Sequence, residues 1–533
     1  MAMRSVASTP GPSSQERPAS RGQQWLVTVA VMAGTFLAVM DISVVNVSMP
    51  HMMGNFGQTL SAITWVATSY SIAEMLMITM AGWWSALLGR KRLYLASLVL
   101  FTLGSMLAGT AQTFPQMLCY RILQGLGGGS VIPLSQAILR ETYPPEEQGM
   151  AMAIFGMGVV LAPAMGPILG GWLTDHYGWP WVFYINIPVS LVALVLVSMY
   201  VADPPYLRRG ITQVDWVGIG LLTLGLTGLQ VVLERGQENN WFQSRWITAG
   251  AIGTVMVLTM LVLWEVRTRE PIMQLRVLRN RSLSVGAGMG LIFGLVLFGT
   301  TFSLPQLTQQ LLHYPAYQAG LVLMPRSLTL FLLMPLVGWL FNFVDPRLLM
   351  AVGIGMTYWA FHHLAQLALT VGFWNLVPIM MLMGAGLPCV FVTLSTVSLR
   401  SVRREDITAA TSLYTLARSV GGNLGYALVA TLLERFSVVH HAYLSTHISG
   451  LNPAYPGYAT ALAARLSHQT GDPVAAQRQA LALVEALLQR QAAMLAYNDV
   501  ARVFGVLFLC TLPLLWLFPR RHSVQSGSPS ARH

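Results

Sequence analysis

The chain has 533 residues, of which 54% are hydrophobic and only 10% are charged. Because a soluble globular domain carries about 25% charged residues, this composition excludes a soluble protein and indicates that lipid is the surrounding solvent. The net charge of +11 does not indicate a nucleic-acid partner, since the basic residues fall in short loops between apolar segments, where they set the orientation in a membrane.

Apolar segments long enough to cross a bilayer, about 20 residues each, follow one another along the chain. Their centres lie near residues 37, 71, 101, 127, 161, 191, 224, 256, 295, 329, 358, 386, 423 and 510. The sequence therefore predicts an all-α integral membrane protein of about fourteen transmembrane helices. We divide it into a disordered cytoplasmic tail (1–23), a six-helix half (24–204), an inserted helix pair (205–270), a second six-helix half (271–518) and a cytoplasmic tail (519–533).

The distribution of Lys and Arg predicts the orientation of these helices. If the N-terminus is cytoplasmic, 21 of the 31 basic residues fall on the cytoplasmic side and 7 on the outer side. The other three, Arg121, Arg326 and Arg418, lie within helices. This bias predicts that both termini are cytoplasmic.

Residues 437–500 are expected to form the one long outer loop. Within it, Asp472 and Pro473 are typical of a helix start, with Asp as the N-cap and Pro in the first turn. An amphipathic stretch through Leu481, Val484 and Leu488 follows. We expect this stretch to lie on the outer surface and to lead into the last transmembrane helix.

Two charged residues lie inside the first and the fourth apolar segments. Asp41 stands in the sequence Met-Asp-Ile-Ser-Val-Val-Asn, and Arg121 opens the sequence Arg-Ile-Leu-Gln-Gly-Leu-Gly-Gly-Gly. A charged side chain within a bilayer is costly, is usually functional and needs a partner. We interpret Asp41 and Arg121 as proton-coupling residues. The alternative is structural: Asp41 caps polar neighbours, and Arg121 only ties helices together.

The fifth apolar segment contains the sequence Gly166-Pro167-Ile-Leu-Gly170-Gly171. With Gly158 and Ala162, Gly166 and Gly170 place a small residue at every fourth position, so they form one smooth helix face. Such a face suits close, sliding contact between membrane helices, although simple tight packing would also explain it.

The loop after the second segment runs from Gly82 through Gly89, Arg90 and Arg92. A basic turn bounded by glycines can act as a gate between two helices, and we interpret Gly82, Gly89 and Arg90 in this way. The alternative is a basic anchor that only fixes the orientation.

Other polar residues within the apolar segments are candidates for substrate binding. Glu74, in the second segment, would attract a cationic compound or carry a proton, and Gln124 and Asn46 are further candidates. Arg326 would balance a carboxylate or bind an anionic substrate, with a structural role as the alternative. Arg418 is the remaining intramembrane charge.

Together these segments resemble the major facilitator superfamily, in particular the fourteen-helix drug:proton antiporters of the EmrB and QacA kind. The Asp41 segment is similar to that family's first-helix signature, the Arg121 segment to its fourth-helix motif, and residues 166–171 to its antiporter motif. The resemblance extends over residues 25 to 518 and includes the sequences Phe183-Tyr-Ile-Asn-Ile-Pro188, Asp215-Trp-Val-Gly218 and Ala417-Arg-Ser-Val-Gly-Gly422. The EmrB branch is indicated by Ile132-Pro-Leu-Ser-Gln136 and Leu233-Glu-Arg-Gly-Gln237.

The resemblance implies a major facilitator fold in the cell inner membrane and export of a small amphipathic compound in exchange for protons, without a cofactor. It also implies a periplasmic adaptor and an outer-membrane channel as possible partners. Two departures concern the gate and a neighbouring loop. Ala86 and Leu87 stand where the family has Asp and Arg, so the charge relay of that Asp is missing or rebuilt. Trp179-Pro180-Trp181 replaces the family's Trp-Arg-Trp.

Nothing in the sequence indicates an enzyme. It contains no phosphate-binding loop of the Walker type, and the three cysteines, Cys119, Cys389 and Cys510, lack the spacing of a metal site. Two alternatives to drug export stay open: a nutrient or siderophore facilitator of the same fold, and a membrane sensor or scaffold that transports nothing. The glycine and proline face of the fifth segment favours export, and the buried charges argue against a scaffold.

Overall fold

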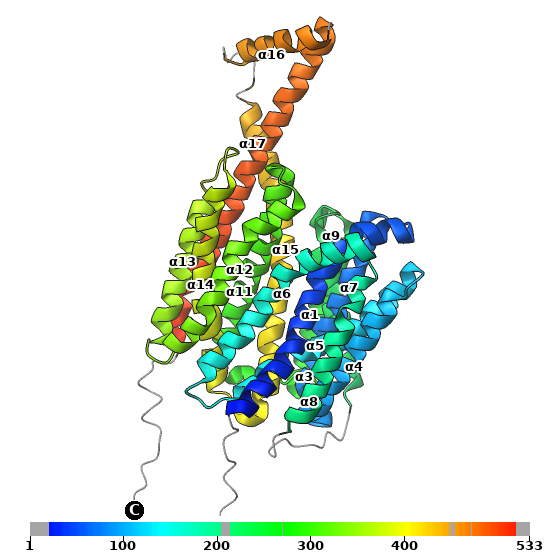
Figure 1. Cartoon of the computed structure of the whole chain (residues 1–533), viewed down its shortest axis with the longest axis vertical. Coiled ribbons are helices and arrows are strands. Elements are labelled where there is room, and N and C mark those ends of the chain that lie inside the picture. Colours follow the sequence, from blue (N-terminus) through cyan, green and yellow to red (C-terminus); the bar gives the residue numbers. More distant parts are fainter. Residues whose placement is uncertain are drawn as a thin grey trace, which may run out of the picture.

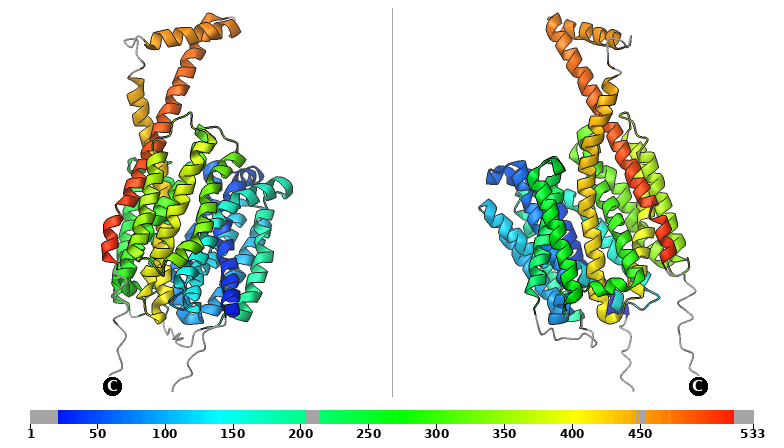
Figure 2. Two further views of the ribbon diagram at one scale, coloured as in Figure 1. Left: turned by 60° about the vertical axis from the view of Figure 1, so that its left-hand side comes forward. Right: turned by 180° about the vertical axis from the view of Figure 1, so that it is seen from behind.

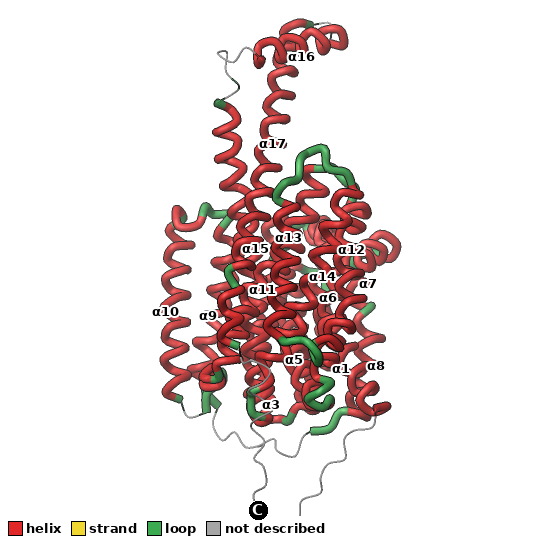
Figure 3. Tube along the Cα trace, turned by 90° about the vertical axis from the view of Figure 1, so that its left-hand side faces the viewer, coloured by secondary structure: helices red, strands yellow, loops and turns green. Residues whose placement is uncertain are grey.

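The computed structural model describes residues 21–518 except 204–213, 269, 447, 449–453 and 471. The described residues form long helices joined by short loops, and none of them lies in a strand (Figure 3). Helices are the expected solution in lipid, because each helix satisfies its own backbone hydrogen-bonding groups where no water is present.

The prediction of an all-α membrane protein is confirmed. Twelve of the described helices are long and apolar enough to cross a membrane. The two other predicted spans, centred near 358 and 423, correspond to α13 and α15, which carry more polar side chains and pack within the bundle. The last predicted centre, residue 510, falls at the end of its helix instead of the middle, because that helix begins far outside the bundle.

The first half of the bundle packs α5 against α3 and α4, and α1 against α5, α6 and α8. These helices appear in blue and cyan in Figure 1. Their bounds are α1 Arg21–Phe56, α2 Leu60–Ile63, α3 Trp65–Leu88, α4 Arg90–Gly109, α5 Phe114–Thr142, α6 Gln148–Tyr177, α7 Trp181–Tyr184 and α8 Asn186–Tyr200.

The second half packs α11 against α15, and α14 against α12 and α13, while α17 lies against α13 and α15. The bounds of its helices are α11 Arg281–Gln306, a π-helical turn η3 Leu307–Leu311, α12 Ala316–Leu340, α13 Pro346–Leu364, α14 Phe373–Arg400, η4 Arg404–Asp406, α15 Ile407–Ser445, α16 Ala454–Thr470, α17 Pro473–Leu509 and η5 Leu512–Leu517.

The two halves meet along two seams. In one seam α6 packs against α12 and α14, and in the other α15 packs against α3 and α5. The inserted pair lies outside this second seam, where α9 contacts both α3 and α15 while α10 contacts mainly α9. The inserted segment comprises α9 Trp216–Gly236, η1 Trp241–Gln243, α10 Arg245–Arg267 and η2 Leu275–Arg279.

Two helices extend well beyond the bundle and carry α16 at their far end (Figures 1 and 2). α15 has 39 residues, which corresponds to about 58 Å, or about twice the hydrocarbon thickness of a bilayer. We call residues 437–446, 454–470 and 473–495 the arm. The expected outer loop 437–500 is therefore largely helical, because α15 and α17 continue into it as an antiparallel pair. α17 begins at Pro473, and Asp472 accepts a hydrogen bond from the Val474 amide, as the sequence predicts.

Candidate transport site

The centre of the first half holds a buried ion pair between α1 and α5. Arg121 Nη1 lies 2.6 Å from Asp41 Oδ2, and both side chains are fully buried. The structure therefore brings together the two residues that the sequence singled out. Each supplies the partner that a charge inside a membrane requires.

Two amides complete the cluster around the Asp41 carboxylate. Gln124 Nε2 donates to Asp41 Oδ1 over 2.7 Å, and Gln124 Oε1 accepts a hydrogen bond from Arg121 over 2.7 Å. Asn186 Nδ2 also donates to Asp41 Oδ1, over 3.0 Å. The carboxylate thus accepts three hydrogen bonds from two other helices. We call Asp41, Arg121, Gln124 and Asn186 the carboxylate cluster.

Local sequence explains how these side chains converge. Arg121 and Gln124 are three residues apart on α5, so they share one helix face. Gly125, on the next position, lets α5 approach α3 so closely that a Cβ there would collide with the carbonyl oxygen of Tyr70. The Arg121 guanidinium lies over the Tyr70 ring, 4.3 Å from its centroid, and Arg121 Nε donates to the carbonyl oxygen of Val66. The guanidinium is therefore fixed by α3 as well as by Asp41.

Sequence reasoning did not select Asn186 as a site residue, although it did single out the surrounding segment 183–188. Asn46, by contrast, was a candidate and does not join the cluster. It is exposed on α1, five residues after Asp41, which turns it about 140° away around the helix axis.

Glu74 lies on α3 at the seam between the halves. Its side chain is buried, and it forms no ion pair within the described part of the chain. Arg418 of α15 is close enough for a Coulombic interaction with it. The antiparallel packing of α3 and α15 explains this placement, since Gly82 meets Ala409 at one level and Met75 meets Asn423 at another.

The predicted gate lies where α3 and α4 meet the second half. Arg90 is buried, pairs with Glu141 at the end of α5, and donates from Nε to Thr408 Oγ1 of α15 over 2.8 Å. A Cβ on Gly82 would lie 2.9 Å from the Cα of Ala409. Gly89 joins α3 to α4 with a φ of 87°, a backbone region that favours glycine. Arg90 thus links both halves at this end, although Ala86 provides no carboxylate.

The glycine face of α6 packs against α1. A Cβ on Gly166 would collide with Ser43, and one on Gly170 would lie 2.8 Å from the carbonyl oxygen of Val44. Both contacts flank Asp41 by one turn or less. Pro167 lies inside α6 between these glycines, while Gly171 has space for a Cβ. The glycine face of α6 therefore runs next to the carboxylate cluster.

Two buried arginines lie in the second half. Arg326 on α12 and Arg418 on α15 are each 5% exposed. Arg326 Nη2 donates to Thr301 Oγ1 of α11 over 3.0 Å. The Arg418 guanidinium lies 5.7 Å from the centroid of the Phe391 ring.

Residues 31–426 of the chain match the Major Facilitator Superfamily. The chain is 32% identical over 500 residues to the multidrug export protein EmrB of Haemophilus influenzae, a match that covers 94% of this chain and 96% of that protein. It is 31% identical over 504 residues to the fatty acid resistance protein FarB of Neisseria gonorrhoeae, covering 94% and 97%.

Two solved structures share the arrangement of helices. The human organic anion transporter MFSD10 superposes with a TM-score of 0.59 at 14% identity, covering 92% of this chain and 99% of that chain. The proton:xylose symporter XylE superposes with a TM-score of 0.61 at 12% identity, covering 94% and 97%. At these identities the likeness concerns the fold alone. The family match over most of the sequence, the helical bundle of two halves and the two relatives at about 30% identity agree: this chain belongs to the Major Facilitator Superfamily.

Proposed function

We propose that this protein is a secondary active transporter that exports amphipathic toxic compounds in exchange for inward protons. The observation that carries the proposal is the carboxylate cluster. A fully buried Asp41 that accepts three hydrogen bonds is costly to keep in a membrane, and coupling to a proton is a function that explains such a cost. Matches to multidrug export relatives over 94% of the chain support export over nutrient uptake.

The geometry supports a specific role for the proton. Hydrogen bonds to an ionised carboxylate are roughly twice as strong as neutral ones. Protonation of Asp41 therefore weakens its bonds to Arg121, Gln124 and Asn186, which tie α1 to α5 and α8. Because Gly166 and Gly170 of α6 pack beside Asp41, loosening α1 alters the neighbouring sliding contact. The two halves then rock about the α3–α15 and α6–α12 seams, and substrate and proton bias the same equilibrium.

The charge bias supports placing this multi-pass protein in the cell inner membrane with both termini in the cytoplasm. In that orientation the arm extends on the outer side. A helical arm that projects so far from a membrane is a suitable docking element for a periplasmic adaptor that leads to an outer-membrane channel, and we include both as proposed partners.

Proton release from the purified protein tests the coupling. Addition of an exported compound to detergent-solubilised protein in weakly buffered solution should release protons, and the release should vanish in Asp41→Asn. A facilitator that binds substrate without proton exchange would release none. Uphill transport in proteoliposomes with an imposed pH gradient, acidic on the outer side of the protein, would then confirm antiport; transport that ignores the gradient would contradict it.

A further inference from the structure

The second half contains a buried guanidinium that pairs with no carboxylate in the part of the chain that the structure describes. Arg326 Nε and Nη1 are buried and have no hydrogen-bond partner among the described residues, and Nη2 donates to the Thr301 hydroxyl. No ion pair within the described residues involves Arg326. Arg121 and Arg90 differ in this respect, since each pairs with a carboxylate. An unpaired charge in such a place is strongly unfavourable unless something else compensates it.

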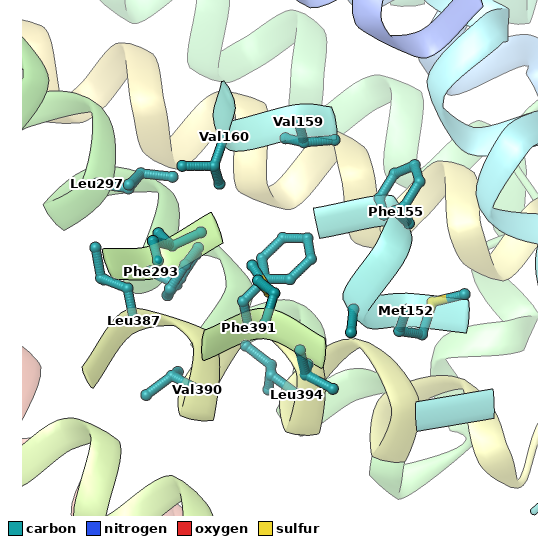
Figure 4. Close-up of a cluster of buried hydrophobic side chains, with 14 of the residues drawn as sticks. Met152, Phe155, Val159, Val160, Phe293, Leu297, Leu387, Val390, Phe391 and Leu394 are labelled. Carbon is teal, nitrogen blue, oxygen red and sulfur yellow. The ribbon is translucent and has the colours of Figure 1, made fainter. Parts of the chain in front are cut away.

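Arg326 borders an apolar cluster at the seam between the halves. In Figure 4, Met152, Phe155, Val159 and Val160 of α6 face Phe293 and Leu297 of α11 and Leu387, Val390, Phe391 and Leu394 of α14. Thr301, which binds Arg326, is one helical turn beyond Leu297. Gly384, whose missing Cβ makes room for the Arg326 backbone, is nearly one turn before Leu387. The cluster and the unpaired guanidinium are therefore neighbours.

This position is one that rocking of the halves would open. The cluster joins α6 of the first half to α11 and α14 of the second, so separating the halves exposes an apolar surface with a cation at its edge. An apolar surface suits the body of an amphipathic compound. The planar fork of Arg, with two free donor nitrogens, suits a carboxylate or another oxyanion.

Arg418 does not offer the same site. It lies beside the same cluster, near Phe391, and its Nη1 also has no hydrogen-bond partner within the described chain. However, the Glu74 carboxylate across the seam acts on its charge. Its contact with α11, at Gly294, is two turns from Thr301, which corresponds to about 10 Å along that helix.

We propose that Arg326 binds the anionic group of amphipathic organic anions while the apolar cluster at the α6–α11–α14 seam holds their apolar body. The inference rests on the proposed export function and adds a substrate class and its binding residue. Arg326 is thus a specificity-determining residue that favours anions, and its unpaired donors are satisfied by the substrate.

Three probes with one naphthalene body test the assignment: naphthoate, naphthamide and naphthylmethylammonium. Binding to the purified full-length chain is measured by isothermal titration calorimetry. Arg326→Gln should weaken naphthoate binding about tenfold to a hundredfold, the range expected when a charge-assisted hydrogen-bonded pair is lost. Binding of the neutral and cationic probes should change less than twofold.

Arg326→Lys should restore part of the naphthoate affinity, because it keeps the charge without the planar guanidinium. Arg435→Gln, at an exposed position of α15, is the matched control and should leave all three probes unchanged.

Stability measurements separate this role from a structural one. Because an unpaired buried charge is costly, its replacement by an apolar side chain of similar length should remove that cost, so Arg326→Met should melt at or above the wild-type temperature. Equal weakening of all three probes, or a lower melting temperature of Arg326→Met, would make Arg326 structural. Failure of wild-type protein to bind naphthoate better than naphthamide would also overturn the inference. Proton-driven export of naphthylmethylammonium does not depend on Arg326. Whether this export occurs therefore tests the proposed antiport separately from the proposed anion site.

Discussion

At the scale of single residues, the sharpest prediction concerns the role of the Asp41 carboxylate in proton coupling. Asp41→Asn keeps the shape of the side chain and mimics a permanently protonated carboxyl. We expect it to abolish proton-driven export while substrate affinity changes less than about tenfold. Uphill transport in proteoliposomes and ligand binding to the same preparation are the two measurements. Asp175→Asn is a control, because Asp175 is exposed near the end of α6. An Asn variant that still concentrates substrate would remove Asp41 from the coupling.

The loss of the Asp41 charge also leaves Arg121 without its carboxylate. Breaking a buried pair in this way costs about 3–5 kcal/mol, so the thermal stability of Asp41→Asn must be measured in parallel. The double variant Asp41→Asn, Arg121→Gln removes both charges and should recover part of the lost stability without recovering coupling. Recovery of both would mean that the pair only holds the helices together.

Glu74 is expected to act on cationic substrates. It is buried at the seam without an ion pair in the described chain, and Gln keeps its shape while removing its charge. Glu74→Gln should therefore weaken export of cationic compounds and lower their half-inhibitory dose about tenfold, as expected for the loss of one charge-assisted hydrogen bond. Neutral compounds should be unaffected. Growth assays against matched cationic and neutral toxicants measure this, with the exposed Glu146→Gln as control. An equal fall in resistance to both classes would assign Glu74 to structure or to proton coupling.

The sequence predicts part of this site and not the rest, for physical reasons. Asp41, Arg121 and Gln124 are predictable because ionic and amide groups are conspicuous within apolar segments that lipid must surround. Asn186 is a single amide near the start of a helix, and its role depends on α8 packing beside α1, which no local pattern encodes. The contact of Arg90 with Glu141 and Thr408 joins residues up to 318 positions apart, so only the fold shows how this end is held without a carboxylate at Ala86.

At the scale of helices, the contact between α3 and α15 depends on the missing side chain of Gly82. Valine at this position would force the backbone of Ala409 away, and overpacking costs about 1–3 kcal/mol. That energy shifts a two-state equilibrium about 5- to 150-fold. Gly82→Val should therefore favour separation of the halves at the Arg90 end and slow transport.

Spin labels can be placed at two exposed positions near this end, Arg92 and Arg404. Pulsed electron paramagnetic resonance then measures the distance between the two labels. The distance distribution should shift to longer values in Gly82→Val. Gly288→Val is the matched control, because nothing lies within 4 Å of a Cβ at Gly288 of α11. An unchanged distribution, or the same shift in the control, would show that the α3–α15 contact does not hold this end closed.

The helices themselves were the most predictable level, because a bilayer demands long apolar segments and satisfied backbones. The arm was not. Residues 437–446 and 473–495 are amphipathic or polar, so hydropathy alone indicates a surface loop there. Their helical state is stabilised by contacts between α15 and α17, where His440 contacts Asp499 over 2.7 Å and His441 contacts Glu485 over 2.8 Å. Such pairs join residues 44 to 59 positions apart.

At the scale of the whole molecule, the arm and the turn between α3 and α4 lie at opposite ends of the bundle (Figure 1), so membrane orientation is testable at two points. In a background without Cys119, Cys389 and Cys510, single cysteines replace Arg465 on α16 or Arg92 on α4, both of them exposed. Because the sequence predicts 21 of the 31 basic residues on the side of Arg92, we expect that side to face the cytoplasm. An impermeant thiol reagent should therefore label the α16 cysteine in spheroplasts, and the α4 cysteine only in inside-out vesicles. Ser85 lies inside α3, four residues before Gly89, and is only 1% exposed, so a cysteine there would give a false negative. The reverse labelling pattern would place the arm in the cytoplasm. That result would contradict both the proposed periplasmic adaptor and the proposal that the protons for Asp41 come from the outer side.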